Sequence, residues 1–256
     1  MHTSPIIYEH PLNERLRFFL RLEFLFQQAR HSMRGEAVWD SHNTLTTLLE
    51  ILNIVSRIDI KTEVIKELDR ISGTLNALTE TPEVNHDTLN QLLATLSGFK
   101  SQLHAMEGPL AQELRENELF KLIIQRSGIP GGLCDFDLPQ YRHWLKSDPN
   151  TRIKNINYWL STLDTLRLSV ELSLKLIRES ADSIQKVAEN GNYHQTLESS
   201  TPYQMIRVWL PRESAYFVEV SAGRHRLTAR FMEADTPTRP TQTTDNVEFR
   251  ISCCAL

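Results

Sequence analysis

Cysteine and histidine are the residue types of this chain that could do nucleophilic or metal chemistry. Cys134 and His143 could serve as the nucleophile and base of a thiol enzyme, but they lie nine residues apart and no set of oxyanion donors accompanies them. The alternative interpretation is a small, buried cysteine without a catalytic role. The nine histidines are scattered singly and show no zinc-ligand spacing. We therefore predict no catalytic residue, no bound metal and no cofactor.

Signature motifs of common enzymes are also absent: the chain has no GxGxxG, no phosphate-binding loop, no GxSxG and no HExxH. Gly131 and Gly132 could present backbone N–H groups to an anion. Without a strand before them, or a Lys and Ser/Thr after them, they are better explained as a connector between helices. Cys253 and Cys254 stand in a CaaX-like C-terminus, but no polybasic stretch precedes them, so we expect no lipidation.

One stretch concentrates positive charge in a pattern typical of binding. Alternation along a strand over 224–232 places three arginines on one face: Arg224, Arg226 and Arg230. Thr228 shares this face, and the opposite face carries residues that can pack on a core: Leu227, Ala229 and Phe231. Guanidinium groups held on a strand can pair with carboxylates of a partner. The alternative is a solvated face whose arginines pair with Glu219 or Glu248 on neighbouring strands.

The composition is that of a soluble globular protein: 256 residues, 40% hydrophobic, 23% charged and a formal net charge of -4. The negative balance argues against general nucleic-acid binding, and Phe231 faces away from the arginines, where it cannot stack on a base. No apolar run approaches the roughly 18 residues of a membrane span, and the N-terminus does not resemble a signal peptide. We expect a cytoplasmic protein with no membrane span.

Apolar residues recur at helical spacing before residue 190. This pattern predicts helices over 13–28, 44–57, 62–78, 89–106, 110–126, 139–144 and 152–187. Apolar residues crowd the first of these helices after its first turn, so it is expected to be buried on most sides. The 89–106 helix has coiled-coil spacing over so short a length that packing within a bundle is favoured. Asn190 and Gly191 are expected to stop the last helix.

Beyond residue 200 the period changes to two. This alternation predicts antiparallel strands over 203–210, 215–220, 224–232 and 247–253, with a longer loop over 236–245. An N-terminal strand over 5–9 would cover the apolar Ile6, Ile7 and Tyr8. The chain is thus predicted to be an α+β protein. An N-terminal helical bundle domain spans 10–195, and 1–9 joins 200–256 in a C-terminal antiparallel β-sheet domain.

Several strings along the chain are specific enough to indicate a family: Tyr8-Glu9-His10-Pro11-Leu12-Asn13-Glu14, Arg21-Leu22-Glu23-Phe24-Leu25, Lys66-Glu67-Leu68-Asp69-Arg70, Ile129-Pro130-Gly131-Gly132, Cys134, Phe136-Asp137-Leu138-Pro139, Trp144-Leu145, Leu176-Ile177-Arg178, Arg230-Phe231-Met232 and Cys253-Cys254. In this order they resemble the ZapD family of FtsZ-associated cell division proteins of Gram-negative bacteria.

The resemblance implies a non-enzymatic cytoplasmic factor that is recruited to the division site at mid-cell. Such a factor is expected to bind the C-terminal tail of FtsZ. As a homodimer it is expected to cross-link FtsZ filaments into bundles that support Z-ring assembly and septation. The resemblance also implies that the final cysteine pair is the family's ending rather than a lipid anchor. A thiol enzyme centred on Cys134 remains the alternative function.

The resemblance also implies which residues bind the tail. Basic positions of the family match Arg21 in the first helix and the strand arginines Arg224, Arg226 and Arg230, and Arg142 stands where a His before the Trp is common. Arg17 lies one helical turn before Arg21 and joins the candidate residues. At Glu118 the family can carry an arginine, so this chain departs from the pattern in the helical part of the expected basic pocket.

Overall fold

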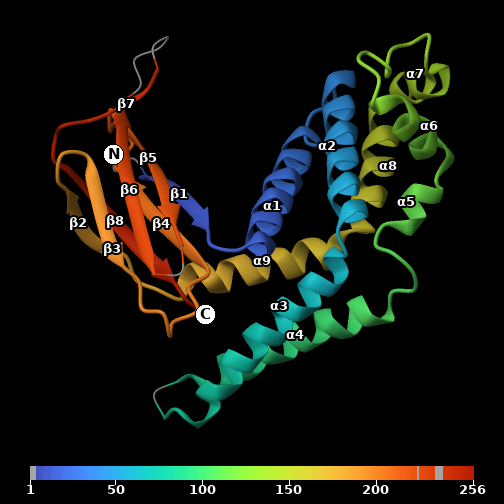
Figure 1. Cartoon of the computed structure of the whole chain (residues 1–256). Helices are drawn as coiled ribbons and strands as arrows, with labels where there is room; N and C mark the ends of the chain where they lie inside the picture. Colours follow the sequence, from blue (N-terminus) through green and yellow to red (C-terminus); the bar gives the residue numbers. More distant parts are fainter. Residues whose placement is uncertain (1–3, 83, 224, 234–238) are drawn as a thin grey trace. The chain divides into compact units, whose positions relative to one another are not determined.

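The structure is a computed structural model that describes residues 4–82, 84–223, 225–233 and 239–256 (Figure 1). The chain divides into two compact units. We call Met1–Arg17 with Leu174–Leu256 the strand unit, and Phe18–Ser173 the helical unit. Helices α1 (Glu14–Ser32) and α9 (Asp164–Glu179) contribute residues to both. Among the helices of the described ranges, none combines the length and the apolar composition that crossing a membrane requires.

Between α1 and α9 the chain forms further helices: α2 (Val38–Arg57), α3 (Ile60–Asn76), the 3₁₀ helix η1 (Ala77–Glu80), α4 (His86–Ala105), α5 (Gln112–Glu116), α6 (Glu118–Ser127), α7 (Pro139–Leu145) and α8 (Pro149–Ser161). In the described ranges, the side-chain oxygen of the residue before the helix accepts a backbone N–H at five helix starts: Asn13 at α1, Asp59 at α3, Asn85 at α4, Asn117 at α6 and Asp148 at α8. These caps explain where each helix begins.

Helix α1 is less enclosed than predicted. Leu16, Phe19 and Leu22 are fully buried, but Phe24 is 64% exposed. Successive residues of a helix turn by about 100°, so a crowded run of apolar residues cannot all face one core. The prediction of burial on most sides was therefore wrong.

Two predicted helices are broken in the structure. The predicted 110–126 helix is split at Asn117, whose extended backbone (φ -65°, ψ 126°) ends α5 and whose side chain caps α6. The predicted 152–187 helix is split between Ser161 and Asp164, ends at Glu179, and is followed by a strand over 184–188. The prediction there was wrong because the spacing of Ile177, Ile184 and Val187 suits a helix as well as a strand.

A buried arginine ties α8 to the start of α2 and to the turn after α7. Arg152 is only 3% exposed. Its Nε donates to Ser41 Oγ at 3.0 Å and its Nη2 to the carbonyl of Glu36 at 2.7 Å, while Nη1 donates to the carbonyl of Ser147. Neutral oxygens thus satisfy this cation, and no carboxylate pairs with it in the described part of the chain.

The described residues of the strand unit form two antiparallel four-stranded sheets. Sheet A has the order β1-β4-β8-β2, and sheet B has the order β3-β6-β5, with β7 also paired to β6. The strands are β1 (Ile6–Pro11), β2 (Ile184–Ala188), β3 (Asn192–Thr196), β4 (Met205–Leu210), β5 (Tyr216–Ala222), β6 (Arg226–Glu233), β7 (Thr241–Gln242) and β8 (Val247–Cys254). The predicted α+β fold and the antiparallel pairing are confirmed, and the strands form two sheets.

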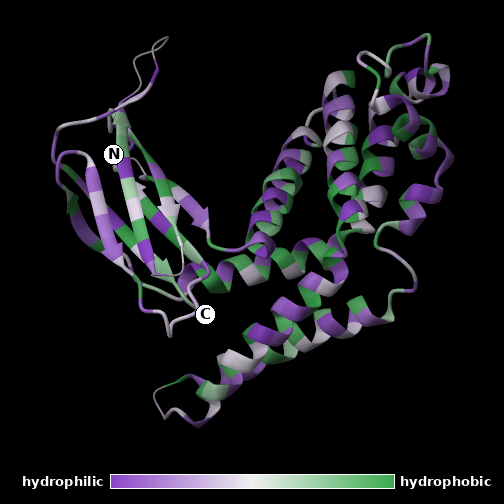
Figure 2. Ribbon diagram, in the orientation of Figure 1, coloured by the Kyte–Doolittle hydropathy of each residue, from purple (hydrophilic) through white to green (hydrophobic). Residues whose placement is uncertain are grey.

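Both sheets contribute to one apolar core. Val208 and Phe249 come from sheet A and Leu227 and Phe231 from sheet B, all buried. The rings of Phe231 and Phe249 lie with their centroids 4.8 Å apart. Figure 2 shows the resulting alternation of hydrophobic and hydrophilic residues along β6. One side of β6 is therefore anchored in the core, and its other side is available for a partner.

The predicted N-terminal strand is confirmed, because β1 pairs with β4 from Ile6 opposite Leu210 to Pro11 opposite Met205. The strand was expected because it would cover Ile6, Ile7 and Tyr8, and this explanation is only partly correct. Tyr8 packs against the core, but Ile6 and Ile7 remain 39% and 42% exposed.

A cluster of three charged residues holds β1 in place. Arg178 Nε and Arg207 Nε each donate to Glu9 Oε1 at 2.9 Å, and Arg178 Nη2 donates to Glu9 Oε2 at 2.7 Å. Arg207 Nη1 also donates to the carbonyl of Arg178 at 3.3 Å. Glu9 lies on β1, Arg207 on β4 and Arg178 near the end of α9, so this Glu9 cluster joins three elements.

Asn190 and Gly191 were predicted to stop a helix, and this prediction was wrong. They form the tight turn between β2 and β3. Both have positive φ, 48° and 67°, which is the combination that a type I′ turn requires. Glu189 and Asn192 form a bridge across this turn. A Cβ added to Gly191 would lie 2.4 Å from the carbonyl oxygen of Thr243, so this position has no room for a side chain.

Candidate functional site

The candidate site is the outer side of β6, which we call the arginine face and define as Arg226, Thr228 and Arg230. Both arginines are exposed, and Leu227, Ala229 and Phe231 between and beside them are fully buried, so the predicted alternation is present. The remaining predicted member, Arg224, lies outside the described residues. Since β6 is hydrogen-bonded to β3 on one side and β5 on the other, the backbone that carries these arginines is held firmly.

Arg230 already has a partner within the sheet. Its Nη2 donates to Glu219 Oε2 at 3.1 Å, and the two residues are paired across β5 and β6. The side chains are 52% and 48% exposed, so this ion pair contributes less than about 1 kcal/mol. The predicted alternative, a solvated pair with Glu219, thus describes Arg230. Glu248, the other acid considered, lies on β8 of sheet A opposite Val187, so it was wrongly placed beside the arginines.

Arg226 differs from Arg230. In the part of the chain that the structure describes, it forms no ion pair and no hydrogen bond through its side chain. It lines a hollow of about 620 Å³ together with Ser221, Gly223, His225 and Thr228. An exposed guanidinium on a central strand, with no acid beside it, is suited to a carboxylate of a partner.

Polar residues of β3 extend the arginine face. Asn192 lies opposite Arg230, His194 opposite Thr228 and Thr196 opposite Arg226. A hydrogen bond of 3.0 Å joins His194 Nδ1 and Thr228 Oγ1, and one of 2.8 Å joins His194 Nε2 and Asn192 Nδ2. The sequence interpretation missed these residues because it ended a helix there. The Asn190-Gly191 pair was the signal, since Asn-Gly is a strong indicator of a turn between strands.

The two arginines of α1 lie one turn apart on that helix. Arg17 pairs with Glu14, three residues earlier on the helix, at 3.5 Å. The guanidinium carbon of Arg21 lies 5.9 Å from the ring centroid of Phe18, and Arg21 lines a hollow of about 480 Å³ with Phe24 and Glu50. Arg21 forms no ion pair within the described ranges. It is the less constrained of the two cations.

Arg142 of α7 forms an ion pair with Asp135. Glu118, the position that departs from the family pattern, pairs with Lys121 at 2.7 Å at the start of α6. Arg21 and Arg142 belong to the helical unit, whereas Arg17, Arg226 and Arg230 belong to the strand unit. The structure therefore brings together the arginines of β6 with one another, and those of α1 with one another.

The three cysteines differ in their surroundings. Cys134 Sγ donates to Asp137 Oδ2 at 3.5 Å, and no interaction with His143 is present among the described residues. Burial raises the pKa of Cys253 to about 11 and also raises the pKa of Cys254. Their thiolates are thus disfavoured at neutral pH. Within the ranges that the structure covers, no three His, Cys, Asp or Glu side chains gather as metal ligands.

Known proteins similar to this chain share nearly its whole length. The sequence model of the ZapD family, described as cell division protein, matches residues 20–230. The chain belongs to the ZapD family. The Cell division protein ZapD of Methylococcus capsulatus is 39% identical over 253 residues, 99% of each chain. Those of Aromatoleum aromaticum and Coxiella burnetii are 37% and 35% identical over the full length of both chains.

Membership of the ZapD family gives this chain a role in cell division. ZapD is named as a cell division protein and not as an enzyme family, which agrees with the absence of enzyme signature motifs from the sequence. The matched range contains Arg21, Arg142, Arg226 and Arg230, and begins three residues after Arg17. Five of the six candidate cations, Arg224 included, therefore lie in the part of the chain that the ZapD model matches.

Proposed function

We propose that this ZapD-family protein binds the C-terminal tail of FtsZ through its arginine face. As a homodimer in the cytoplasm, it cross-links FtsZ filaments into bundles at the division site. Arg226 supports this proposal best, because it is exposed, lacks an acidic partner among the described residues and stands on a strand anchored in the core. Arg230 adds a second guanidinium on the same face, and Arg17, Arg21 and Arg142 are proposed to extend the contact.

The proposed mechanism is geometric and electrostatic. A charge-assisted hydrogen bond that is shielded from water contributes about 1.5 to 3 kcal/mol, and an exposed ion pair less than about 1 kcal/mol. Each guanidinium can hold a carboxylate of the tail by two parallel hydrogen bonds. A two-fold dimer presents the same face twice, so one dimer holds two filaments, and the second contact benefits from a raised effective concentration.

A charge-reversal variant tests the proposal. Arg226→Glu combined with Arg230→Glu should weaken binding by roughly a hundredfold, because two shielded pairs at the low end amount to about 3 kcal/mol. Arg250→Glu is the matched control, since Arg250 is an exposed arginine of the same unit but lies on β8 of sheet A. Co-sedimentation with polymerised FtsZ, with and without its tail, measures the effect.

The outcomes separate the parts of the proposal. Wild type and Arg250→Glu should bundle FtsZ only when the tail is present, and the double variant should not, while circular dichroism reports an unchanged fold. A folded double variant that bundles FtsZ normally would move the site to the helical arginines. Sedimentation equilibrium should give twice the chain mass for wild type and double variant alike, and a monomer that still bundles would refute cross-linking by a dimer.

A further inference from the structure

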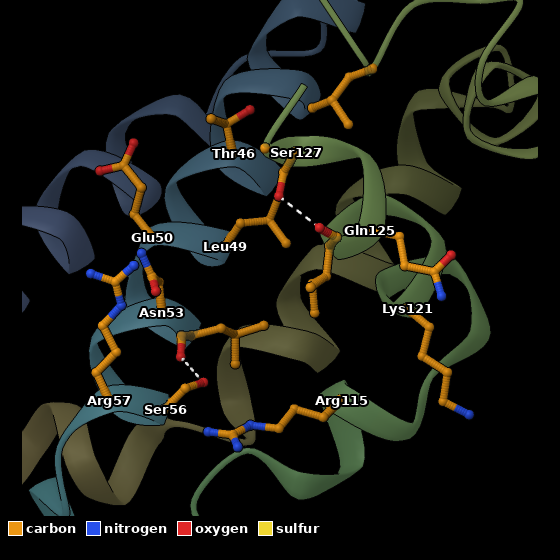
Figure 3. Close-up of a pocket in the computed structure, with 14 residues that line it drawn as sticks. Thr46, Leu49, Glu50, Asn53, Ser56, Arg57, Arg115, Lys121, Gln125 and Ser127 are labelled. Carbon is orange, nitrogen blue, oxygen red and sulfur yellow. Dashed lines mark hydrogen bonds between the residues drawn. The ribbon is translucent and has the colours of Figure 1, made fainter. Parts of the chain in front are cut away.

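A cavity of about 950 Å³ lies in the helical unit between α2 and α6 (Figure 3). Its apolar lining includes Leu49 and Leu52 of α2, Ile124 of α6, and Leu133 from the loop that follows α6. The size is at the upper end of the range of small-molecule sites, and the mixture of apolar walls with a few polar groups is typical of them. None of the predicted tail-binding arginines lines this cavity.

Two arginines contribute to the lining of this cavity. Arg57 ends α2 and Arg115 comes from α5, and both also line a smaller neighbouring hollow of about 310 Å³. Figure 3 shows Arg115 reaching from its helix toward Ser56, while the side chain of Arg57 runs along α2 toward Asn53. Neither guanidinium forms an ion pair or a hydrogen bond within the described residues. Two cations without a partner among the described residues therefore line the same cavity.

Arg115 has the greater need for a hydrogen-bond acceptor of the two arginines. Its Nε and Nη2 are inaccessible to water and have no hydrogen-bond partner. A buried donor that belongs to a charged group costs about 1 to 3 kcal/mol or more when it is left unpaired. An anion seated in the cavity would remove this cost, since a guanidinium presents two parallel N–H groups to a carboxylate or a phosphate.

The other charged residues of the lining are Lys121 and Glu50. Lys121 pairs with Glu118 at 2.7 Å, and its amino group points away from the cavity in Figure 3. Glu50 is exposed, and in Figure 3 its carboxylate points away from Arg115. The hydroxyls of Ser56 and Ser127 already donate to backbone carbonyls of their own helices. Among the basic residues of the lining, Arg57 and Arg115 are therefore the two that lack a partner within the described residues.

We propose that this cavity binds a small organic anion, a compact apolar body that carries one phosphate or carboxylate group. Arg115 and Arg57 hold the anionic group, and Leu49, Leu52, Ile124 and Leu133 contact the apolar body. The inference is separate from tail binding by the arginine face, because it uses different residues and its test does not involve FtsZ.

Isothermal titration of the full-length protein with four probes tests the site. Phenyl phosphate and benzoate carry an apolar ring and an anion, inorganic phosphate carries the anion alone, and benzyl alcohol carries the ring alone. We expect one or both ring-bearing anions to bind with a dissociation constant below about 1 mM, and the other two probes to bind at least tenfold more weakly. The preferred ring-bearing anion identifies the anionic group.

Variants assign the binding to the two arginines. Arg115→Gln and Arg57→Gln should each weaken the preferred probe at least tenfold, and Arg126→Gln, an exposed arginine of α6 outside the cavity, should change it less than twofold. If Arg115→Gln does not fold, the Arg57→Gln variant still tests the proposal, because Arg57 is exposed. The proposal is overturned if no ring-bearing anion binds wild type below about 10 mM, or if folded Arg57→Gln binds as well as wild type.

Discussion

Glu219 is the one acidic side chain that forms an ion pair with the described part of the arginine face. If Arg230 contacts the tail of FtsZ, Glu219 competes with that tail for the guanidinium. Replacing Glu219 by Gln keeps its shape and removes the competing charge. We predict that Glu219→Gln strengthens tail binding about two- to fivefold, in line with the small energy of an exposed pair.

Fluorescence anisotropy with a labelled FtsZ tail peptide measures this change. Glu248→Gln is the control, because it removes the same charge from β8 of sheet A. Weaker binding by folded Glu219→Gln would show that the acid supports the site rather than competing with it.

At the residue scale, the hydrogen bonds of Arg152 lead to a prediction about stability. Arg152→Met fills a similar volume but leaves Ser41 Oγ and the carbonyls of Glu36 and Ser147 without their donor. We expect the free energy of unfolding to fall by about 3 kcal/mol or more, as for the loss of a buried hydrogen-bond network. Urea denaturation measures it, and Lys154→Met, an exposed position of the same helix, should change it by less than about 0.5 kcal/mol. Equal effects of the two variants would contradict the role of this network.

At the scale of elements, the sequence patterns predicted secondary structure better than they predicted which strands pair. Alternation in β6 and helical spacing in α2, α3 and α4 depend on neighbours in sequence. The predicted bounds of β6, α3 and α4 were within three residues of those observed, whereas α2 begins six residues before its predicted start. The strand β2 was missed because its apolar spacing fits a helix, and only pairing with β8 decides between the two.

The same reasoning separates the predictable and unpredictable parts of the candidate site. The direction of Arg226 and Arg230 follows from strand geometry alone, and it was predicted correctly. Which acids and hydroxyls lie beside them depends on strand order. For that reason Glu248 was wrongly considered a neighbour, and His194 of β3 was not considered at all. The cation pair of Arg57 and Arg115 comes from segments too far apart in sequence to be recognised.

The turn between β2 and β3 gives an element-scale prediction. Gly191→Ala requires a positive φ at a residue with a Cβ and places that Cβ against the carbonyl of Thr243. We expect a loss of about 2 kcal/mol or more in the free energy of unfolding. Asn190→Gly is the matched change at the other turn position, where positive φ is also required, and it should cost less than about 1 kcal/mol. Thermal denaturation followed by circular dichroism compares them, and a smaller loss for Gly191→Ala would be inconsistent with the crowded turn.

At the scale of the whole molecule, two histidines make stability depend on pH. Burial lowers the pKa of His42 below its usual 6.5, and burial together with the nearby Arg17 lowers the pKa of His10. The hydroxyl of Tyr141, whose pKa is raised by burial, can donate to neutral His42 Nδ1 at 2.8 Å. The unfolded chain therefore takes up these protons at a higher pH than the folded protein does.

The contribution of these two histidines to stability should consequently be fully present above about pH 6.5. The free energy of unfolding should fall as the pH decreases through the lowered pKa values. We predict a lower urea midpoint at about pH 5.5 than at about pH 7.5, and a smaller difference between the two in His42→Gln, which has no proton to take up at this position. His31→Gln, an exposed histidine, serves as control. A pH difference in His42→Gln as large as in wild type would remove His42 as a cause.

The Glu9 cluster also has a consequence for how the protein is made. Glu9 leaves the ribosome 198 residues before Arg207, with which it forms a hydrogen bond. Strand β1 therefore cannot pair until β4 has been synthesised, and its residues Ile6, Ile7 and Tyr8 remain unpaired until then. An unpaired apolar strand is a segment at which nascent chains associate wrongly. Sheet A is thus completed only after β8 has been synthesised, and its first strand depends until then on whatever protects nascent chains in the cell.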